Sequence, residues 1–174
     1  MDVALVIGHH PDAQGATLEL EGESVTEWEL WAPFARELDK TLPVESTVVK
    51  RPSRQPDSEL AAAVNHTGAD VAIELHFNAA QRSASGCEML HYPKSTEGRA
   101  LAKLLQEKTV SALGNRSRGV DARGDLLFLE KTVMPAVICE PFFGSNPGGA
   151  FRALTRLPSL LDAYRTAILQ YLRE

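Results

Sequence analysis

The sequence contains no apolar run of the roughly 18 residues that a membrane-spanning helix needs. Its start also has neither the basic residues nor the length of a signal peptide, because the short apolar run over residues 3–7 directly follows Met1 and Asp2. We therefore expect a protein that is synthesised in the cytoplasm without a signal peptide and has no transmembrane segment.

Cysteine is scarce, and basic residues are not clustered. The only cysteines are Cys87 and Cys139, each inside an apolar stretch typical of a strand, which predicts buried thiols rather than a disulfide or a CxxC metal site. Lys and Arg number 18 against 23 Asp and Glu, for a formal net charge of −5. Binding to nucleic acid needs several convergent cations, so nucleic acid is excluded as the main partner.

Enough apolar sequence is present for one folded domain. Of the 174 residues, 44% are hydrophobic and 24% are charged, which excludes a disordered chain. Unbroken apolar runs predict strands buried on both faces, and segments with helical periodicity separate them. We expect a single α/β domain over residues 1–174, a three-layer sandwich with a mostly parallel or mixed sheet of about six strands flanked by helices. The main strands are predicted at residues 3–7, 69–73 and 134–139, and the helices at 26–41, 57–67, 95–113 and 157–172.

Other segments have weaker patterns. Thr26 and Glu29 form a capping box that starts the first helix, but Pro33 predicts either a kink or a later start of regular helix. The weaker strands are predicted at residues 46–50, 87–92 and 126–129, and the loops at residues 11–25, 51–56, 81–86, 114–124 and 146–149.

Polar residues end three of the predicted strands. The first strand is followed by Gly8, His9 and His10, the second main strand by His76, and the third ends at Glu140. Ligands of open α/β sheets bind outside the carboxyl ends of the strands, so we expect these side chains to converge. Two imidazoles and one carboxylate form a catalytic zinc site when a further position is left open for water.

The third zinc ligand has more than one candidate. Glu140 is placed either to complete the site or to act as the general base on the bound water. Glu27, at the start of the first helix, is the better candidate for the ligand, because the preceding loop can carry it back over the strand ends. Glu23 and Glu29 are alternatives to Glu27 as this ligand. For Glu140, the alternative to a catalytic role is an ion pair with Arg118 or Arg123.

Four segments resemble motifs of the zinc-dependent N-acetylmuramoyl-L-alanine amidases and follow one another in the same order as in that family. These enzymes are peptidoglycan amidases and include endolysin-like catalytic domains. Two of the motifs are the histidine that closes the first strand and the glutamate that heads the first helix. The others are a second histidine motif and a catalytic glutamate segment preceded by Arg-Gly-Val. They read Val-Ile-Gly-His at 6–9, Thr-Glu-Trp-Glu-Leu-Trp at 26–31, Ala-Asp-Val-Ala-Ile-Glu-Leu-His-Phe-Asn at 69–78, and Met-Pro-Ala-Val-Ile-Cys-Glu-Pro-Phe-Phe-Gly-Ser-Asn at 134–146.

The resemblance implies a function and a set of site residues. It implies that His9, Glu27 and His76 hold Zn²⁺ and that Glu140 is the general acid/base for a metal-bound water nucleophile. The substrate would be peptidoglycan or a muropeptide, cut at the amide between N-acetylmuramic acid and L-alanine. Asn78 is a candidate for substrate binding, although it is equally a turn former. We expect a monomer that another protein releases to the cell wall, unless it acts on imported wall fragments.

Two residues depart from the family pattern. Members usually carry glycine after the first histidine, and His10 stands there instead, so His10 is an alternative ligand to His9. Glu74 lies on the same strand face as His76, at a position where members usually have a small residue. It is either a hydrogen-bond partner of that histidine or a carboxylate that points into a polar cleft. The same ligands would also suit a zinc carboxypeptidase or deacylase, and the fold alone would suit a catalytically silent peptidoglycan-binding domain.

Overall fold

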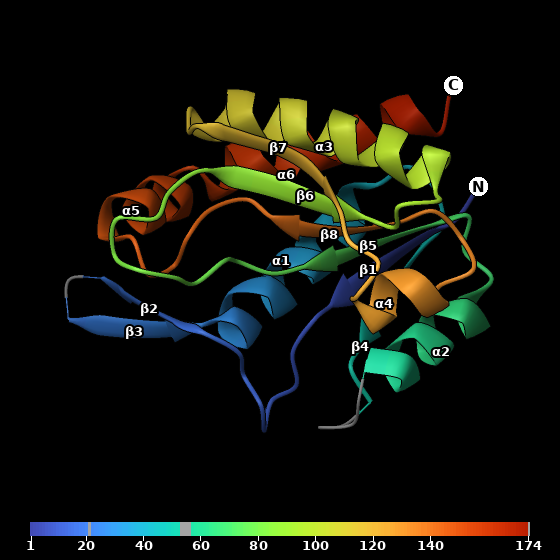
Figure 1. The fold of residues 1–174 in the computed structure, drawn as a ribbon, viewed down its shortest axis with the longest axis horizontal. Helices are drawn as coiled ribbons and strands as arrows, with labels where there is room; N and C mark the ends of the chain where they lie inside the picture. The colour runs from blue at the N-terminus through green and yellow to red at the C-terminus, as the bar shows by residue number, and fades with distance from the viewer. Residues whose placement is uncertain (21, 53–56, 174) are drawn as a thin grey trace.

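The computed structural model describes residues 1–20, 22–52 and 57–173, and a six-stranded sheet forms its centre. The sheet has the order β4-β1-β5-β8-β6-β7 (Figure 1). Only β6 and β8 pair antiparallel within it, so the sheet is mixed, as expected. Its strands are β1 (Val3–Ile7), β4 (Ser46–Lys50), β5 (Val71–Leu75), β6 (Cys87–His91), β7 (Ser117–Ala122) and β8 (Ala136–Glu140).

Helices cover both faces of this sheet, which confirms the three-layer α/β sandwich. One core joins the sheet to α1, α3 and α6 through residues such as Leu5 and Trp31, and the other joins it to α2 and α4 through Val6 and Phe128 (Figure 1). Adjacent residues of β1 therefore belong to opposite cores, as strand geometry requires. The helices are α1 (Glu27–Thr41), α2 (Asp57–Thr67), α3 (Thr96–Leu113), α4 (Leu127–Lys131), α5 (Pro147–Thr155) and α6 (Leu157–Tyr171).

The start of α1 follows the predicted capping box. The side chain of Thr26 accepts from the backbone N–H of Glu29, and the Glu29 carboxylate accepts from the backbone N–H of Thr26. Pro33 lies exposed inside the helix, so the predicted later start is wrong. This start matters for the site, because it fixes Glu27 as the first residue of α1.

Two predicted segments have a different structure. The strand predicted at residues 126–129 is wrong: this apolar run begins the short helix α4, which buries Phe128 and Leu129 toward α2. The loop predicted at 114–124 contains β7, an edge strand whose residues are exposed or half-buried and so give no apolar run.

Two other predicted loops also contain regular structure. Residues 146–149 are the N-cap and first turn of α5, because the Asn146 side chain accepts from the backbone N–H of Gly149. The loop predicted at 11–25 contains a hairpin of β2 (Thr17–Leu20) and β3 (Glu23–Thr26). Residues 81–86 form a loop as predicted, and residues 53–56 of the loop predicted at 51–56 lie outside the described residues.

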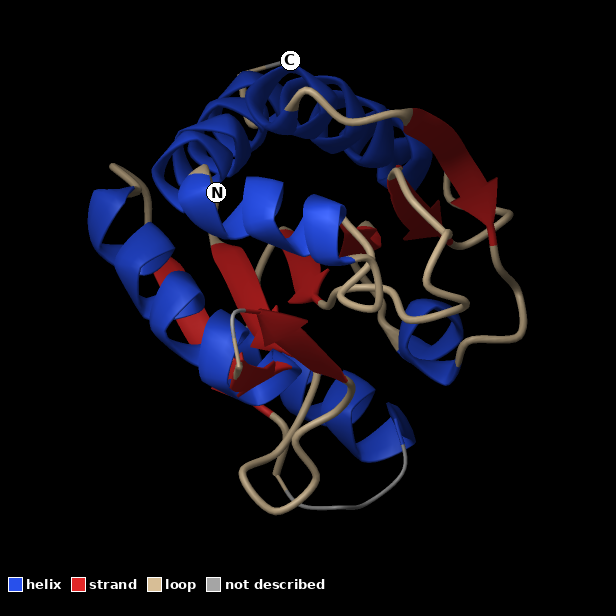
Figure 2. Cartoon of the chain, turned by 90° about the vertical axis from the view of Figure 1, so that its left-hand side faces the viewer, coloured by secondary structure: helices blue, strands red, loops and turns tan. Residues whose placement is uncertain are grey.

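The strand order defines where a site can form. From β1 the chain passes to β4 on one side, and β5 then pairs with β1 on its other side. The order reverses between β1 and β5, and ligands of open α/β sheets bind at the carboxyl ends beside such a switch point. Figure 2 views the molecule from the left of Figure 1, where the β2–β3 hairpin lies in front of these strand ends. Within the part of the chain that the structure describes, no helix is both long and apolar enough to cross a membrane.

Candidate functional site

Three of the predicted ligands come together at the ends of β1 and β5. One donor atom from each of His9, Glu27 and His76 lies within 4.8 Å of the other two. His9 follows β1, His76 follows β5, and the pairing of these strands brings the two imidazole rings to a centroid separation of 4.8 Å. Two imidazole nitrogens and a carboxylate oxygen are a donor set that suits zinc. The side chains present therefore fit a metal ion of this kind.

The carboxylate of Glu27 lies between the two histidines. Its Oε1 is 3.3 Å from His9 Nε2 and accepts from the backbone N–H of Ala16 at 3.0 Å. Its Oε2 is 3.0 Å from His76 Nδ1 and accepts from the backbone N–H of Phe77 at 3.1 Å. The two backbone donors fix the orientation of this buried carboxylate, so both oxygens face the histidines.

Two glycines make room for the histidine rings. A Cβ added at Gly8 would lie 2.0 Å from His76 Nε2, and one added at Gly15 would lie 2.6 Å from His9 Nε2. Gly15 also has a φ of +80°, a conformation that favours glycine. The backbone therefore approaches both rings more closely than any other residue would allow.

The predicted alternatives to these residues lie elsewhere. His10 Nδ1 accepts from the backbone N–H of Asp12 at 3.1 Å, within the turn after β1. The Glu29 carboxylate accepts from the backbone N–H of Thr26, the N-cap of α1, and Glu23 lies in β3. Neither they nor His10 join the group of three side chains identified among the described residues.

Glu140 lies at the end of β8 and shares a donor with a second carboxylate. Asn78 Nδ2 donates to Glu140 Oε2 and, at 2.6 Å, to Glu88 Oε1. Glu88 is the residue directly opposite Glu140 in the antiparallel β6–β8 pair. Arg118 Nε donates to Glu88 Oε2 at 2.8 Å, so this arginine pairs with Glu88 rather than with Glu140. Asn78 therefore serves to hold Glu140 in place, and its role in substrate binding stays a prediction.

Burial and neighbouring charges set the protonation of the site. Burial is the main cause that raises the pKa of Glu140 to about 7, with the nearby Glu88 adding to the effect and His76 opposing it. Burial alone would raise the pKa of Glu27, but hydrogen bonds from His76 and His9 lower it to about 2. Burial would lower the pKa of His76, but the carboxylates of Glu74 and Glu27 raise it to about 10. A carboxyl group that titrates near neutral pH is suited to proton transfer.

Sequence reasoning missed two residues of this site. Glu88 follows Gly86 and Cys87 at the start of a weak strand, and nothing in its spacing indicates a role. Arg51 lies in a segment read only as a loop, yet its Nε donates to the carbonyl of Gly8 at 2.6 Å. The signal that would have found Glu88 is the antiparallel pairing of β6 with β8, which the sequence does not reveal.

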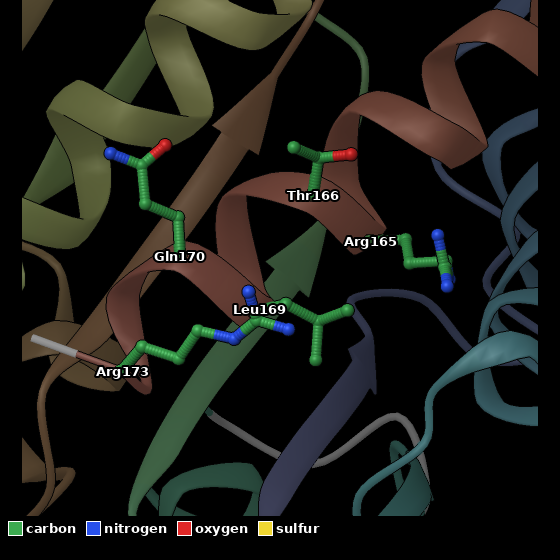
Figure 3. A pocket seen from close by; sticks show the side chains of 5 residues that line it. All are labelled: Arg165, Thr166, Leu169, Gln170 and Arg173. Atoms are coloured by element: carbon green, nitrogen blue, oxygen red, sulfur yellow. The ribbon is translucent and has the colours of Figure 1, made fainter.

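A hollow of about 520 Å³ lies on α6, away from these side chains (Figure 3). Its lining comes from the second half of α6 and from Arg173, which follows this helix, on the side of the molecule where Figure 1 shows both termini. Arg165 in this lining donates to the carbonyl of Thr41 and so joins α6 to the end of α1. The hollow contains none of the predicted site residues; its lining is Arg165, Thr166, Leu169, Gln170 and Arg173.

Comparison with known proteins agrees with this geometry. An α/β sheet that carries two imidazoles and two carboxylates at one edge is typical of metallohydrolases. Residues 3–168 match the N-acetylmuramoyl-L-alanine amidase family. The chain belongs to this family.

Individual relatives extend the comparison. The germination-specific N-acetylmuramoyl-L-alanine amidase of Bacillus subtilis (strain 168) is 30% identical over 121 residues, which cover 67% of this chain and 50% of that protein. This chain therefore spans about half the length of that relative. The structure of an N-acetylmuramoyl-L-alanine amidase from Clostridium difficile 630 has a TM-score of 0.87 at 24% identity, with 99% of this chain and 97% of the other covered. The catalytic domain of an endolysin targeting Clostridia Difficile has a TM-score of 0.80 at 23% identity, with 98% and 97% covered. At these identities the two structures establish the fold.

Proposed function

We propose that this chain is a zinc-dependent hydrolase that cleaves the amide between N-acetylmuramic acid and L-alanine in peptidoglycan. The observation that carries the proposal is the convergence of His9, Glu27 and His76 within 4.8 Å at the strand ends of an amidase-family fold. Glu140 ends the strand beside β5, at the same edge of the sheet. One copy of the chain supplies all four side chains, so the proposal requires only a monomer. Release to the cell wall by another protein stays a prediction.

His9, Glu27 and His76 would hold the metal ion in this proposal. When bound, zinc polarises the scissile carbonyl and makes water more acidic. The Glu140 carboxylate takes a proton from the attacking water as the new C–O bond forms. It then gives that proton to the amine of L-alanine as the C–N bond breaks, so a single group serves as base and then as acid. The products are a muramoyl carboxylate and a peptide with a free N-terminal alanine.

Asn78 and Glu88 orient Glu140 for this proton transfer. The Asn78 amide, through Nδ2, donates to one oxygen of Glu140 and also to Glu88. The guanidinium of Arg118 in turn donates to Glu88 and lies 5.1 Å from the centroid of the Phe143 ring. These contacts fix the carboxylate of the proposed base, and none of them uses a side chain that is proposed to bind the metal.

Digestion of purified sacculi tests the proposal. We expect the wild type to hold about one zinc, to release peptides with N-terminal alanine and to create no reducing sugar ends. A chelator should abolish the activity, and added zinc should restore it. His76→Ala should lose both zinc and activity, because it removes one of three ligands. The matched control is His66→Ala, since His66 is exposed on α2 and bonds the carbonyl of Ala62.

Other outcomes would assign a different function. New termini other than alanine would identify a carboxypeptidase or a deacylase with the same metal site. Binding of sacculi that is indifferent to chelator, without cleavage, would identify a peptidoglycan-binding domain. Zinc content is read independently of cleavage, so these two results are distinguishable.

The pH dependence of kcat/KM should shift when the charge of Glu88 is removed. Glu140 acts as a base only when it is ionised, so kcat/KM should rise with pH as this carboxyl group loses its proton. A bound cation favours the carboxylate, which places this rise at or below the value of about 7 that burial and Glu88 produce without a metal. Glu88→Gln removes a negative charge that raises the pKa of Glu140, and we expect the rise to move to lower pH by roughly half a unit or more.

Arg118→Gln provides the matched control of opposite sign. It removes the cation that offsets the charge of Glu88, so the rise in kcat/KM should move to higher pH. Profiles measured from pH 4 to 9 at saturating zinc compare the three proteins. If Glu88→Gln leaves the profile in place, or moves it to higher pH, the electrostatic role of Glu88 is wrong.

A further inference from the structure

A buried carboxylate lies beneath one of the proposed ligands. Glu74, in β5, is only 2% exposed, and its Oε1 is 3.1 Å from His76 Nε2. The other ring nitrogen of His76, Nδ1, faces Glu27 at 3.0 Å. The two nitrogens therefore have different partners: Nδ1 faces the group of proposed ligands, and Nε2 faces the interior of the protein.

Arg51 provides the countercharge for Glu74. Its Nη2 lies 3.8 Å from Glu74 Oε1, and its Nε donates to the carbonyl of Gly8 at 2.6 Å. A charge buried in this way is tolerated when it is paired and hydrogen-bonded. Arg51 follows β4 and Gly8 follows β1, so a single guanidinium connects the ends of three adjacent strands. Its bond to Gly8 also holds the backbone next to His9.

These contacts determine which nitrogen of His76 can take a metal. Both ring nitrogens face a carboxylate, but only Nδ1 faces Glu27, which is itself a proposed ligand. With a metal held by these ligands, Nε2 would carry the hydrogen and donate it to the carboxylate of Glu74, because an ionised carboxylate only accepts hydrogen bonds. A metal binds an unprotonated imidazole nitrogen, and Nδ1 is the nitrogen that remains for this purpose. A carboxylate on the opposite nitrogen also makes the imidazole a better electron donor to the metal.

We propose that Glu74 and Arg51 form a positioning pair for His76, which fixes the ring orientation and its protonated nitrogen and so raises the affinity of the site for zinc. The inference rests on the proposed function, because it requires His76 to be a metal ligand. It selects between the two roles that the sequence left open for Glu74, since the carboxylate contacts His76 and Arg51 and is not directed into an open cleft. Glu74 is thus predicted to act through His76, without touching the substrate.

Zinc affinity, measured by competition with a chromogenic chelator, tests this pair directly. Glu74→Gln keeps the shape and an acceptor oxygen but removes the charge, and we expect roughly 10-fold weaker zinc binding. Glu74→Ala removes the acceptor as well, and we expect roughly 100-fold weaker binding. The matched control is Glu107→Gln, which neutralises an exposed carboxylate on α3 that pairs with Lys108; its zinc affinity should equal that of the wild type.

Two further measurements separate positioning from a general structural role. Metal-free Glu74→Gln should still unfold in one cooperative transition, at a lower melting temperature than the wild type, because the substitution removes the countercharge that Glu74 provides to Arg51. Sacculus digestion by the wild type is measured in parallel. If both Glu74 variants bind zinc within about two-fold of a wild type that cleaves sacculi, the positioning role is overturned and the proposed function stands. A wild type that binds no zinc would overturn both.

Discussion

Glutamine in place of Glu140 should lower kcat/KM for sacculus hydrolysis by about 10³-fold, within the range of roughly 10² to 10⁴ that a general acid/base contributes. Glutamine has nearly the same shape and can still accept from Asn78 Nδ2, but it cannot take a proton from water at neutral pH. The side chain is not one of the three that converge between β1 and β5, so the variant should retain about one zinc. Activity and metal content, measured on the same preparation, check both expectations.

The matched control for this variant is Glu107→Gln. Glu107 is exposed on α3 and pairs with Lys108 at 3.1 Å, so neutralising it should leave kcat/KM and zinc content as in the wild type. Retention of more than a tenth of the activity by Glu140→Gln would contradict the role of Glu140 as base. Loss of zinc by that variant would instead indicate that Glu140 is itself a ligand, the alternative that the sequence left open.

The central strands could be predicted because they are buried on both faces. β1 and β5 are entirely buried, and the apolar residues that fill β1 and begin β5 gave their existence and nearly their bounds. Strands β5 and β8 begin two residues later than predicted, after Asp70 and Pro135. Edge strand β7 has no comparable run, since only Gly119 and Val120 are as much as half-buried. The apolar run that starts at Leu126 was too short to distinguish a strand from the helix α4.

The candidate site was predictable to the extent that it lies at strand ends. His9 and His76 each follow an apolar run, and the parallel pairing of β1 and β5 makes them neighbours. Glu27 was the better candidate from its place at the start of the first helix, but Glu23 and Glu29 stayed open as alternatives, because a carboxylate in the first turn of a helix is common for other reasons. Glu88 depends on an antiparallel partner that is distant in the sequence. Contacts of this kind follow from the strand order, which the sequence alone did not provide.

Alanine in place of Gly8 should disrupt the metal site without any direct change to a ligand. Gly8 is not among the glycines with positive φ, so its backbone accepts alanine. The added Cβ, however, would lie 2.0 Å from Nε2 and 2.2 Å from Cε1 of His76. The His76 ring must move away from the backbone. This movement breaks the contact of Nε2 with Glu74 and directs Nδ1 away from Glu27. We expect zinc affinity at least about 100-fold weaker and sacculus hydrolysis lowered by about 10²-fold or more.

Gly124→Ala is the matched control for this steric effect. A Cβ at Gly124 would meet only Pro93, at 3.5 Å, which is an ordinary van der Waals contact. This variant should bind zinc and cleave sacculi as the wild type does. Circular dichroism of both metal-free variants establishes that they fold, since overpacking at Gly8 should cost about 1 to 3 kcal/mol of the free energy of unfolding. Wild-type zinc affinity in a folded Gly8→Ala protein would mean that His76 does not bind the metal from this position, because the ring and the new methyl group cannot occupy the same space.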